Sequence, residues 1–182
     1  MPVSSTIAKK EMIEWIKSKV GKNDWILDVG PGCGTYADLL IKENFNNIDA
    51  VEVYEPYIRD YKLVTKYFKV FNEDIRTFEP EKPYKLLILG DVLEHLPQKD
   101  ARALLDKWEK IAEHIIISVP YNNIQGEYKG NVYETHHQPD LNKEVFKERY
   151  PEFECIAEGF DPVYKARGVQ YDDIGAWVWS KS

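Results

Sequence analysis

A glycine-rich turn between a strand and a helix constrains this chain more than any other feature. Residues 26–34 read Ile-Leu-Asp-Val-Gly-Pro-Gly-Cys-Gly, and a helical pattern follows. The apolar start predicts a buried strand. Glycines at alternate positions (Gly30, Gly32 and Gly34) allow positive φ and a close approach of the backbone to a ligand. The next helix offers unpaired N–H groups and the positive end of its dipole, so we expect the turn to hold a small molecule.

Length and composition indicate one globular domain over residues 1–182. The hydrophobic and charged fractions, 43% and 30%, are ordinary for a soluble protein. The formal net charge of −7 argues against a nonspecific nucleic-acid or anionic-membrane surface. There is no apolar signal core and no membrane-length run, so we expect a cytoplasmic protein. Two cysteines, Cys33 and Cys155, are too few for a disulfide framework.

Strand patterns alternate with helix patterns through the first two thirds of the chain. Such alternation predicts a parallel sheet with right-handed crossovers, and continuous apolar runs indicate strands that are covered on both faces. The expected strands are residues 25–29, 48–53, 67–71, 86–89 and 114–119, and the expected helices are residues 7–20, 36–43, 56–65 and 98–112.

The pattern changes after Pro120. Residues 120–140 lack periodicity, and an irregular segment of this length in a compact domain is usually a functional loop. A short helix is expected over residues 141–149. Strand patterns at residues 153–159 and 176–179, joined by a second long loop, then predict an antiparallel pair at the sheet edge. The resulting fold class is α/β, a Rossmann-like three-layer sandwich.

Acidic residues follow the predicted strands at the rim where ligands bind in open parallel sheets. Glu52 comes 20 residues after Gly32, a spacing that suits a carboxylate accepting hydrogen bonds from a ribose diol. Its alternative is a solvated strand-end glutamate. Asp74 follows the third strand, where it either accepts from an adenine amino group or belongs to a simple turn.

The glycine turn departs from two common nucleotide sites. In the dinucleotide fingerprint G-x-G-x-x-G/A, counting from Gly30 puts Thr35 at the third small position, and Gly34 comes one residue early. The P-loop pattern G-x-x-x-x-G-K-[ST] is absent, and the turn holds no basic residue. A dehydrogenase and a nucleoside triphosphatase are therefore disfavoured.

Five segments, in order, resemble the motifs of class I S-adenosylmethionine-dependent methyltransferases. The resemblance is detailed between residues 24 and 120 and is carried by residues 27–34, 51–53, 73–75, 91–96 and 116–120. It implies a mostly parallel seven-stranded sheet with an antiparallel edge strand, and S-adenosylmethionine as the cofactor.

The resemblance also implies roles for individual residues. The three glycines would wrap the methionine part of the cofactor, and Asp28 would orient its ammonium group through water. Glu52 would bind the ribose hydroxyls. Val53 would lie against the adenine, and Asp74 and the Ile75 amide would bind its edge. Asp91 would place a negative charge beside the sulfonium.

Methyl transfer to oxygen or nitrogen often needs a base, and imidazole titrates near neutral pH. His136, His95 and His137 are the candidates. His136 is preferred because family members often carry a histidine that faces the acceptor on the loop after the fifth strand. The alternative is a loop histidine that caps the helix beginning near Leu141.

A metal site is the alternative use of the same segment. Asp91, Glu94, His95 and a later histidine resemble the two-carboxylate, two-histidine site of small-RNA 2′-O-methyltransferases, and such ligands suit Mg²⁺, Mn²⁺ or Zn²⁺. The aspartate at the first position has a shorter reach than the glutamate of that pattern. The resemblance also includes members in which Glu94-His95 only packs at a helix start, so the metal is not favoured.

We expect a methyltransferase that acts on oxygen or nitrogen of a small molecule. The acidic balance and the absence of an N-P-P-Y motif disfavour nucleic-acid acceptors, although a metal-assisted RNA 2′-O-methyltransferase and a noncatalytic cofactor-binding domain stay as alternatives. The tyrosine-rich loops are expected to form either a lid over the acceptor or an interface for a homodimer; they contain Tyr121, Tyr128, Tyr133, Tyr164 and Tyr171.

Overall fold

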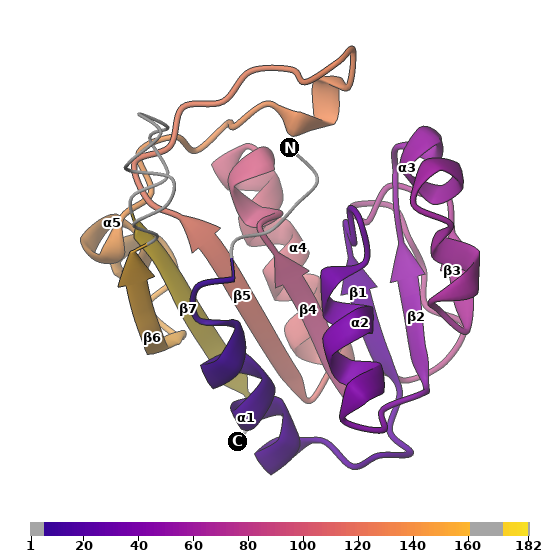
Figure 1. The fold of residues 1–182 in the computed structure, drawn as a ribbon. Coiled ribbons are helices and arrows are strands. Elements are labelled where there is room, and N and C mark those ends of the chain that lie inside the picture. The colour runs from indigo at the N-terminus through magenta and orange to yellow at the C-terminus, as the bar shows by residue number, and fades with distance from the viewer. Residues whose placement is uncertain (1–5, 161–172, 182) are drawn as a thin grey trace.

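A seven-stranded sheet runs through the centre of the molecule (Figure 1). The computed structural model describes residues 6–160 and 173–181. The strand order is β3-β2-β1-β4-β5-β7-β6. The strands are β1 (Ile26–Val29), β2 (Ile48–Val51), β3 (Lys69–Phe71), β4 (Leu86–Gly90), β5 (His114–Pro120), β6 (Glu154–Phe160) and β7 (Asp173–Ser180).

The first five strands are parallel, and the last two form an antiparallel pair. Val29 at the end of β1 lies opposite Val51 of β2 and Leu89 of β4, so the carboxyl ends of these strands meet at one rim. The chain reverses its direction of travel across the sheet between β1 and β4, which is where open sheets of this kind bind ligands. The predicted fold class and the antiparallel pair at the edge are confirmed.

Helices cover both faces of the sheet, and strand side chains alternate between the two cores. Ile88 and Ile116 pack with α1 (Lys9–Lys19) and α2 (Thr35–Lys42), which lie in front of the sheet in Figure 1. Leu89 and Ile117 pack on the opposite face against α4 (Gln98–Ile111) and α5 (Lys143–Arg149). Each fully buried apolar side chain of this kind stabilises the fold by about 1.5–3 kcal/mol. The sheet rim is therefore a rigid support.

The predicted continuous helix over residues 56–65 is wrong. Helix α3 spans Glu55–Asp60, and a separate turn η1 follows at Leu63–Thr65. The chain breaks between them because Lys62 adopts a left-handed conformation with φ 51°. The 120–140 segment is irregular as expected, except for a short turn η3 at Val132–Glu134.

Two further observations concern the end of the chain and membranes. Most of the predicted loop over residues 160–175 lies outside the described residues. Within the described ranges, none of the helices combines the length and the apolar character needed to cross a bilayer.

Candidate active site

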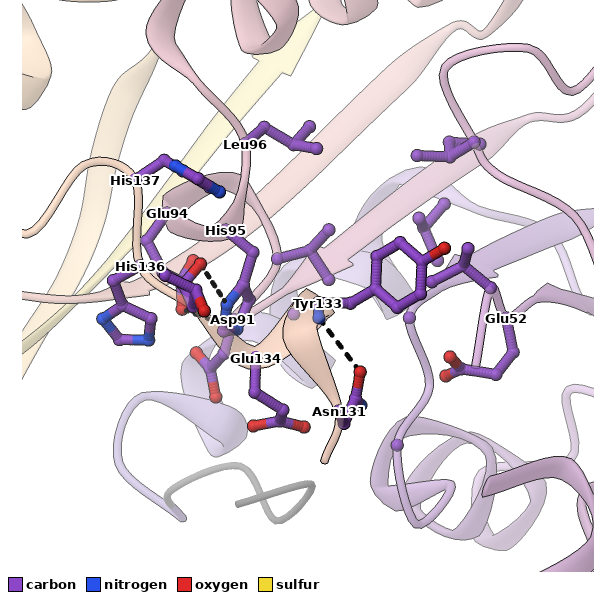
Figure 2. A pocket seen from close by; sticks show the side chains of 18 of the residues that line it. Glu52, Asp91, Glu94, His95, Leu96, Asn131, Tyr133, Glu134, His136 and His137 are labelled. Atoms are coloured by element: carbon purple, nitrogen blue, oxygen red, sulfur yellow. Dashed lines mark hydrogen bonds and ion pairs between the residues drawn. The ribbon is translucent and has the colours of Figure 1, made fainter. Parts of the chain in front are cut away.

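A cavity of about 490 Å³ opens at the carboxyl ends of β1, β2, β4 and β5. All of the predicted site residues except Asp28 and Gly34 line it. Figure 2 shows the histidines with Asp91, Glu94 and Glu134 gathered at one end and Glu52 at the other, with the Tyr133 ring between them. We call these the histidine end and the glycine end of the cavity.

The glycine turn forms the floor of the glycine end. Gly30 and Gly32 line the cavity with φ values of 58° and 54°. A Cβ on Gly30 would lie 2.8 Å from Cγ2 of Val92, so any larger residue at this position would crowd the Val92 side chain. Gly34 has φ 83° and is the N-cap residue of α2; as a glycine it provides no side-chain hydrogen bond to this helix end.

Glu52 is the buried carboxylate of the glycine end. Its side chain accepts a hydrogen bond from the Tyr54 amide at 2.8 Å, and the residue is only 4% exposed. Burial raises its pKa to about 7. An ionised carboxylate offers about four acceptor positions, so Glu52 has capacity for two further donors such as a pair of ligand hydroxyls.

Asp74 lines the cavity, and it also belongs to a turn. Its carboxylate accepts from the Arg76 amide at 2.9 Å and from the Arg76 guanidinium at 2.6 Å, and these hydrogen bonds lower its pKa. Arg76 in turn reaches Asp100 at 3.1 Å. The observed hydrogen bonds of Asp74 are therefore those of a turn, and its hydrogen bond to an adenine amino group stays a prediction. Val53 and Ile75 contribute apolar surface nearby.

Asp28 lies behind the cavity instead of lining it. Its Oδ2 accepts from the Tyr67 hydroxyl at 2.6 Å, while its Oδ1 is buried without a hydrogen-bond partner among the described residues. Burial raises its pKa to about 7. The sequence did not predict the hydrogen bond between Tyr67 and Asp28. A water-mediated contact of Asp28 with a ligand stays a prediction.

His95 and His136 meet at the histidine end, with ring centroids 4.7 Å apart. Nδ1 of His136 lies 2.9 Å from the carbonyl oxygen of Asn123, and Nδ1 of His95 lies 3.3 Å from that of Thr135. A carbonyl only accepts, so both Nδ1 atoms carry the hydrogen and both Nε2 atoms keep a free lone pair. Burial lowers the pKa of both rings, that of His95 to about 4, so both are neutral at pH 7.

Glu94 completes this end. The residue is 1% exposed, and neither carboxylate oxygen has a hydrogen-bond partner among the described residues. Burial, together with the charge of Asp91, raises its pKa well above the usual range. Oε1 lies 4.0 Å from Nε2 of His95, and one ligand atom from each of Glu94, His95 and His136 falls within 4.8 Å of the others. One carboxylate and two imidazoles whose Nδ1 atoms are held by carbonyls fit a divalent cation. Asp91 is not part of this group.

A contact across the cavity mouth was not predicted. The Tyr57 hydroxyl of α3 donates to Oε1 of Glu134 in η3 at 2.8 Å, and Gln125 donates to Oε2 at 3.1 Å. The first of these hydrogen bonds connects the loop after β5 to α3, and the second lies within that loop. No spacing in the sequence indicates the first contact because its partners are 77 residues apart.

No family model matches the sequence, and no curated protein matches it either. Solved structures do match. Magnesium protoporphyrin IX methyltransferase from Synechocystis, with S-adenosylmethionine bound, is 15% identical over 94% of this chain and 77% of its own (TM-score 0.62). An S-adenosylmethionine-dependent methyltransferase from Clostridium acetobutylicum is 11% identical over 95% and 90% (TM-score 0.66). The fold is that of class I methyltransferases.

A third match extends the range of proteins that share this fold. The glycopeptide N-methyltransferase MtfA, complexed with S-adenosylhomocysteine, is 14% identical over 98% of this chain and 92% of its own (TM-score 0.64). At such identities the likeness establishes the methyltransferase fold, and the chemistry has to be argued from the residues of the cavity.

Proposed function

We propose that this chain transfers a methyl group from S-adenosylmethionine to an oxygen or nitrogen of a small-molecule acceptor. The observation that carries the proposal is Glu52. A strand-end carboxylate is buried beside a positive-φ glycine turn, in the cavity at the switch point of a methyltransferase fold. A group with this burial and spare acceptor capacity suits the two hydroxyls of a ribose.

The glycine end would hold the methyl donor. Glu52 would accept from the ribose, Val53 would lie against the adenine, the Ile75 amide would meet the adenine edge, and the backbone at Gly30 and Gly32 would follow the methionine part. Asp91 lines the cavity at the histidine end, where its carboxylate would add negative charge for the cationic sulfur. Asp74 would accept from the adenine amino group with a carboxylate that Arg76 also binds.

The donor supplies a methyl carbon bound to a positively charged sulfur, which accepts the electron pair of the broken bond and leaves neutral. The protein therefore has no new anion to stabilise. Its main task is to align the acceptor with that carbon, and alignment of this kind lowers a barrier by about 7–11 kcal/mol. His136 takes the proton from the acceptor at Nε2, since the ring is neutral and Nδ1 is occupied by Asn123.

Metal-assisted transfer to a hydroxyl is the second candidate. The Glu94 carboxylate favours it, because neither of its oxygens has a hydrogen-bond partner within the described part of the chain. Glu94 and the Nε2 atoms of His95 and His136 would hold the cation, which would lower the pKa of a bound hydroxyl. Calorimetric titration with zinc is expected to show one site in the wild type and none in Glu94→Gln. Absence of zinc binding by the wild type would leave His136 as the base.

Transfer of a tritium-labelled methyl group into a cell extract tests the main proposal. The extract is separated into small-molecule, RNA and protein fractions, with and without a chelator. Label in the small-molecule fraction is expected, and insensitivity to the chelator would support the base mechanism. Label confined to RNA would contradict the proposed acceptor class. Donor binding without any transfer would indicate a noncatalytic domain.

A further inference from the structure

A buried lysine approaches the cavity wall from the α1 face of the sheet. Lys9 is the first residue of α1 and is 5% exposed. Its Nζ donates to the Tyr36 hydroxyl at 2.7 Å and to the Ser118 hydroxyl at 3.3 Å. It does not line the cavity, and the mechanism described above makes no use of it.

The hydrogen bonds around Lys9 run in one direction. An ammonium only donates, so the oxygens of Tyr36 and Ser118 accept from it. The Ser118 hydroxyl then donates to Oδ1 of Asp91 at 2.8 Å. The Tyr36 hydroxyl donates to Sδ of Met12 at 3.2 Å. Lys9 thus reaches the carboxylate of Asp91 through one serine.

The hydrogen bonds and nearby charges around Lys9 stabilise its charged form. Burial alone would lower the pKa of the amine, but its interactions with Tyr36 and Asp91 outweigh that effect and raise the pKa. An ammonium without such partners is strongly disfavoured in a protein interior. Lys9 is therefore charged, and its nearest route to a cavity-lining carboxylate leads to Asp91.

The backbone around Asp91 is adapted to the same contacts. Asp91 has φ 57°, a value that non-glycine residues adopt rarely, and its amide donates to the Ser118 carbonyl at 2.9 Å. A Cβ on the preceding Gly90 would lie 2.1 Å from Cε2 of Tyr36. Gly90 thus allows Tyr36 to pack close to the strand. Ser118 binds both the amide and the carboxylate of Asp91.

We propose that Lys9 is a positioning residue for the methyl donor: through Ser118 it fixes the Asp91 carboxylate on the wall of the cavity, where that carboxylate would attract the cationic sulfur. The inference rests on the proposed function. It also gives α1 a role in donor binding, although α1 packs on the face of the sheet away from α4 and α5.

Two variants break the connection in different ways. Ser118→Ala removes the hydroxyl without changing the charge, and Lys9→Met removes the charge while keeping an unbranched apolar side chain. The matched control is Lys10→Met, because Lys10 is the exposed neighbour on the same helix. Dissociation constants for S-adenosylmethionine and S-adenosylhomocysteine are measured by calorimetry, with thermal melting as the check of folding.

Each variant is expected to weaken S-adenosylmethionine binding about tenfold and S-adenosylhomocysteine binding far less, because the second ligand lacks the sulfonium charge. The double variant should lose no more than the more severe single variant, since both changes break one connection. Lys10→Met should behave as wild type.

Three results would overturn the inference. An unchanged preference between the two ligands in Ser118→Ala and Lys9→Met, with a lower melting temperature in Lys9→Met, would make Lys9 a packing residue only. Additive losses in the double variant would show that the two residues act separately. If the wild type bound neither ligand, the proposed function itself would fail, and this inference with it.

Discussion

The glycine end and the histidine end of the cavity are built in different ways. At the glycine end, Gly30 and Glu52 directly follow strands whose ends are aligned by parallel pairing. At the histidine end, His95 follows β4, but His136 is brought to it by a long irregular segment held through backbone carbonyls. Sheet register thus creates the first end, and loop packing creates the second.

This difference carries over to chemistry. The residues of the glycine end are held in place by the strands that they follow. The histidine end joins two neutral imidazoles to the buried carboxyl group of Glu94, which has no hydrogen-bond partner in residues 6–160 and 173–181, and this combination suits proton transfer or a cation. Perturbing each end separately should therefore separate turnover from donor binding.

The largest expected effect is on turnover, from His136→Ala at the histidine end. Loss of a general base lowers kcat by about 10²–10⁴-fold, while the dissociation constant for S-adenosylhomocysteine should stay within about twofold. Steady-state kinetics and calorimetry measure the two quantities. His114→Ala is the control. His114 lies at the start of β5, away from the rim, where its ring contacts the Ser180 hydroxyl. Unaltered turnover in His136→Ala would remove it as the base.

Glu52→Ala at the glycine end should do the reverse. Losing two hydrogen bonds to a charged acceptor weakens donor binding about 100-fold, or about 3 kcal/mol. The melting temperature should not fall, because a buried carboxylate with a raised pKa contributes little to stability. Glu55→Ala, an exposed neighbour, is the control. Calorimetry showing wild-type affinity would contradict the ribose assignment.

The pH dependence of donor binding sharpens the same assignment. Burial raises the pKa of Glu52 to about 7, and ligand hydroxyls favour its ionised form. Below pH 7 binding must therefore release a proton, so affinity for S-adenosylhomocysteine should fall about tenfold between pH 8 and pH 6. Glu52→Gln should remove this dependence.

Asp28 offers the competing explanation for such a pH effect, since burial also raises its pKa to about 7. Asp28→Asn is therefore measured beside Glu52→Gln. A dependence that persists in Glu52→Gln and vanishes in Asp28→Asn would transfer the effect to the carboxylate behind the cavity.

The smallest expected effect is on stability at the glycine turn. Gly30→Ala places a Cβ 2.8 Å from Val92 at φ 58°, and a left-handed conformation costs a non-glycine residue about 1–2 kcal/mol. The melting temperature should fall by roughly 2–4 °C per kcal/mol for a domain of this size. Gly126→Ala, with open space around its Cβ and an ordinary φ, should melt as wild type.

The same contrast explains what the sequence could predict. The glycine turn and Glu52 both line the cavity, and both are local features attached to strands; the ribose role that the count of 20 residues suggested stays a prediction. His95 and His136 were predicted to lie in the site, but no pattern could show that their rings are 4.7 Å apart or that a carboxylate oxygen of Glu94 lies within 4.8 Å of both.

Contacts between distant segments were missed for a physical reason. The Lys9–Ser118 and Tyr57–Glu134 hydrogen bonds join residues 109 and 77 positions apart, and only the folded sheet brings them together. The break in the predicted helix at Lys62 also escaped prediction, since lysine is an unusual residue for a left-handed conformation. Asp28 matched the motif, but strand geometry turned its side chain away from the cavity.

The most direct test of the account is calorimetric binding of S-adenosylhomocysteine to the wild-type protein, with NAD titrated in parallel. One site per chain for S-adenosylhomocysteine and no heat of binding for NAD is the predicted result. Binding of NAD alone, or of neither ligand, would contradict the assignment of the glycine end to a methyl donor.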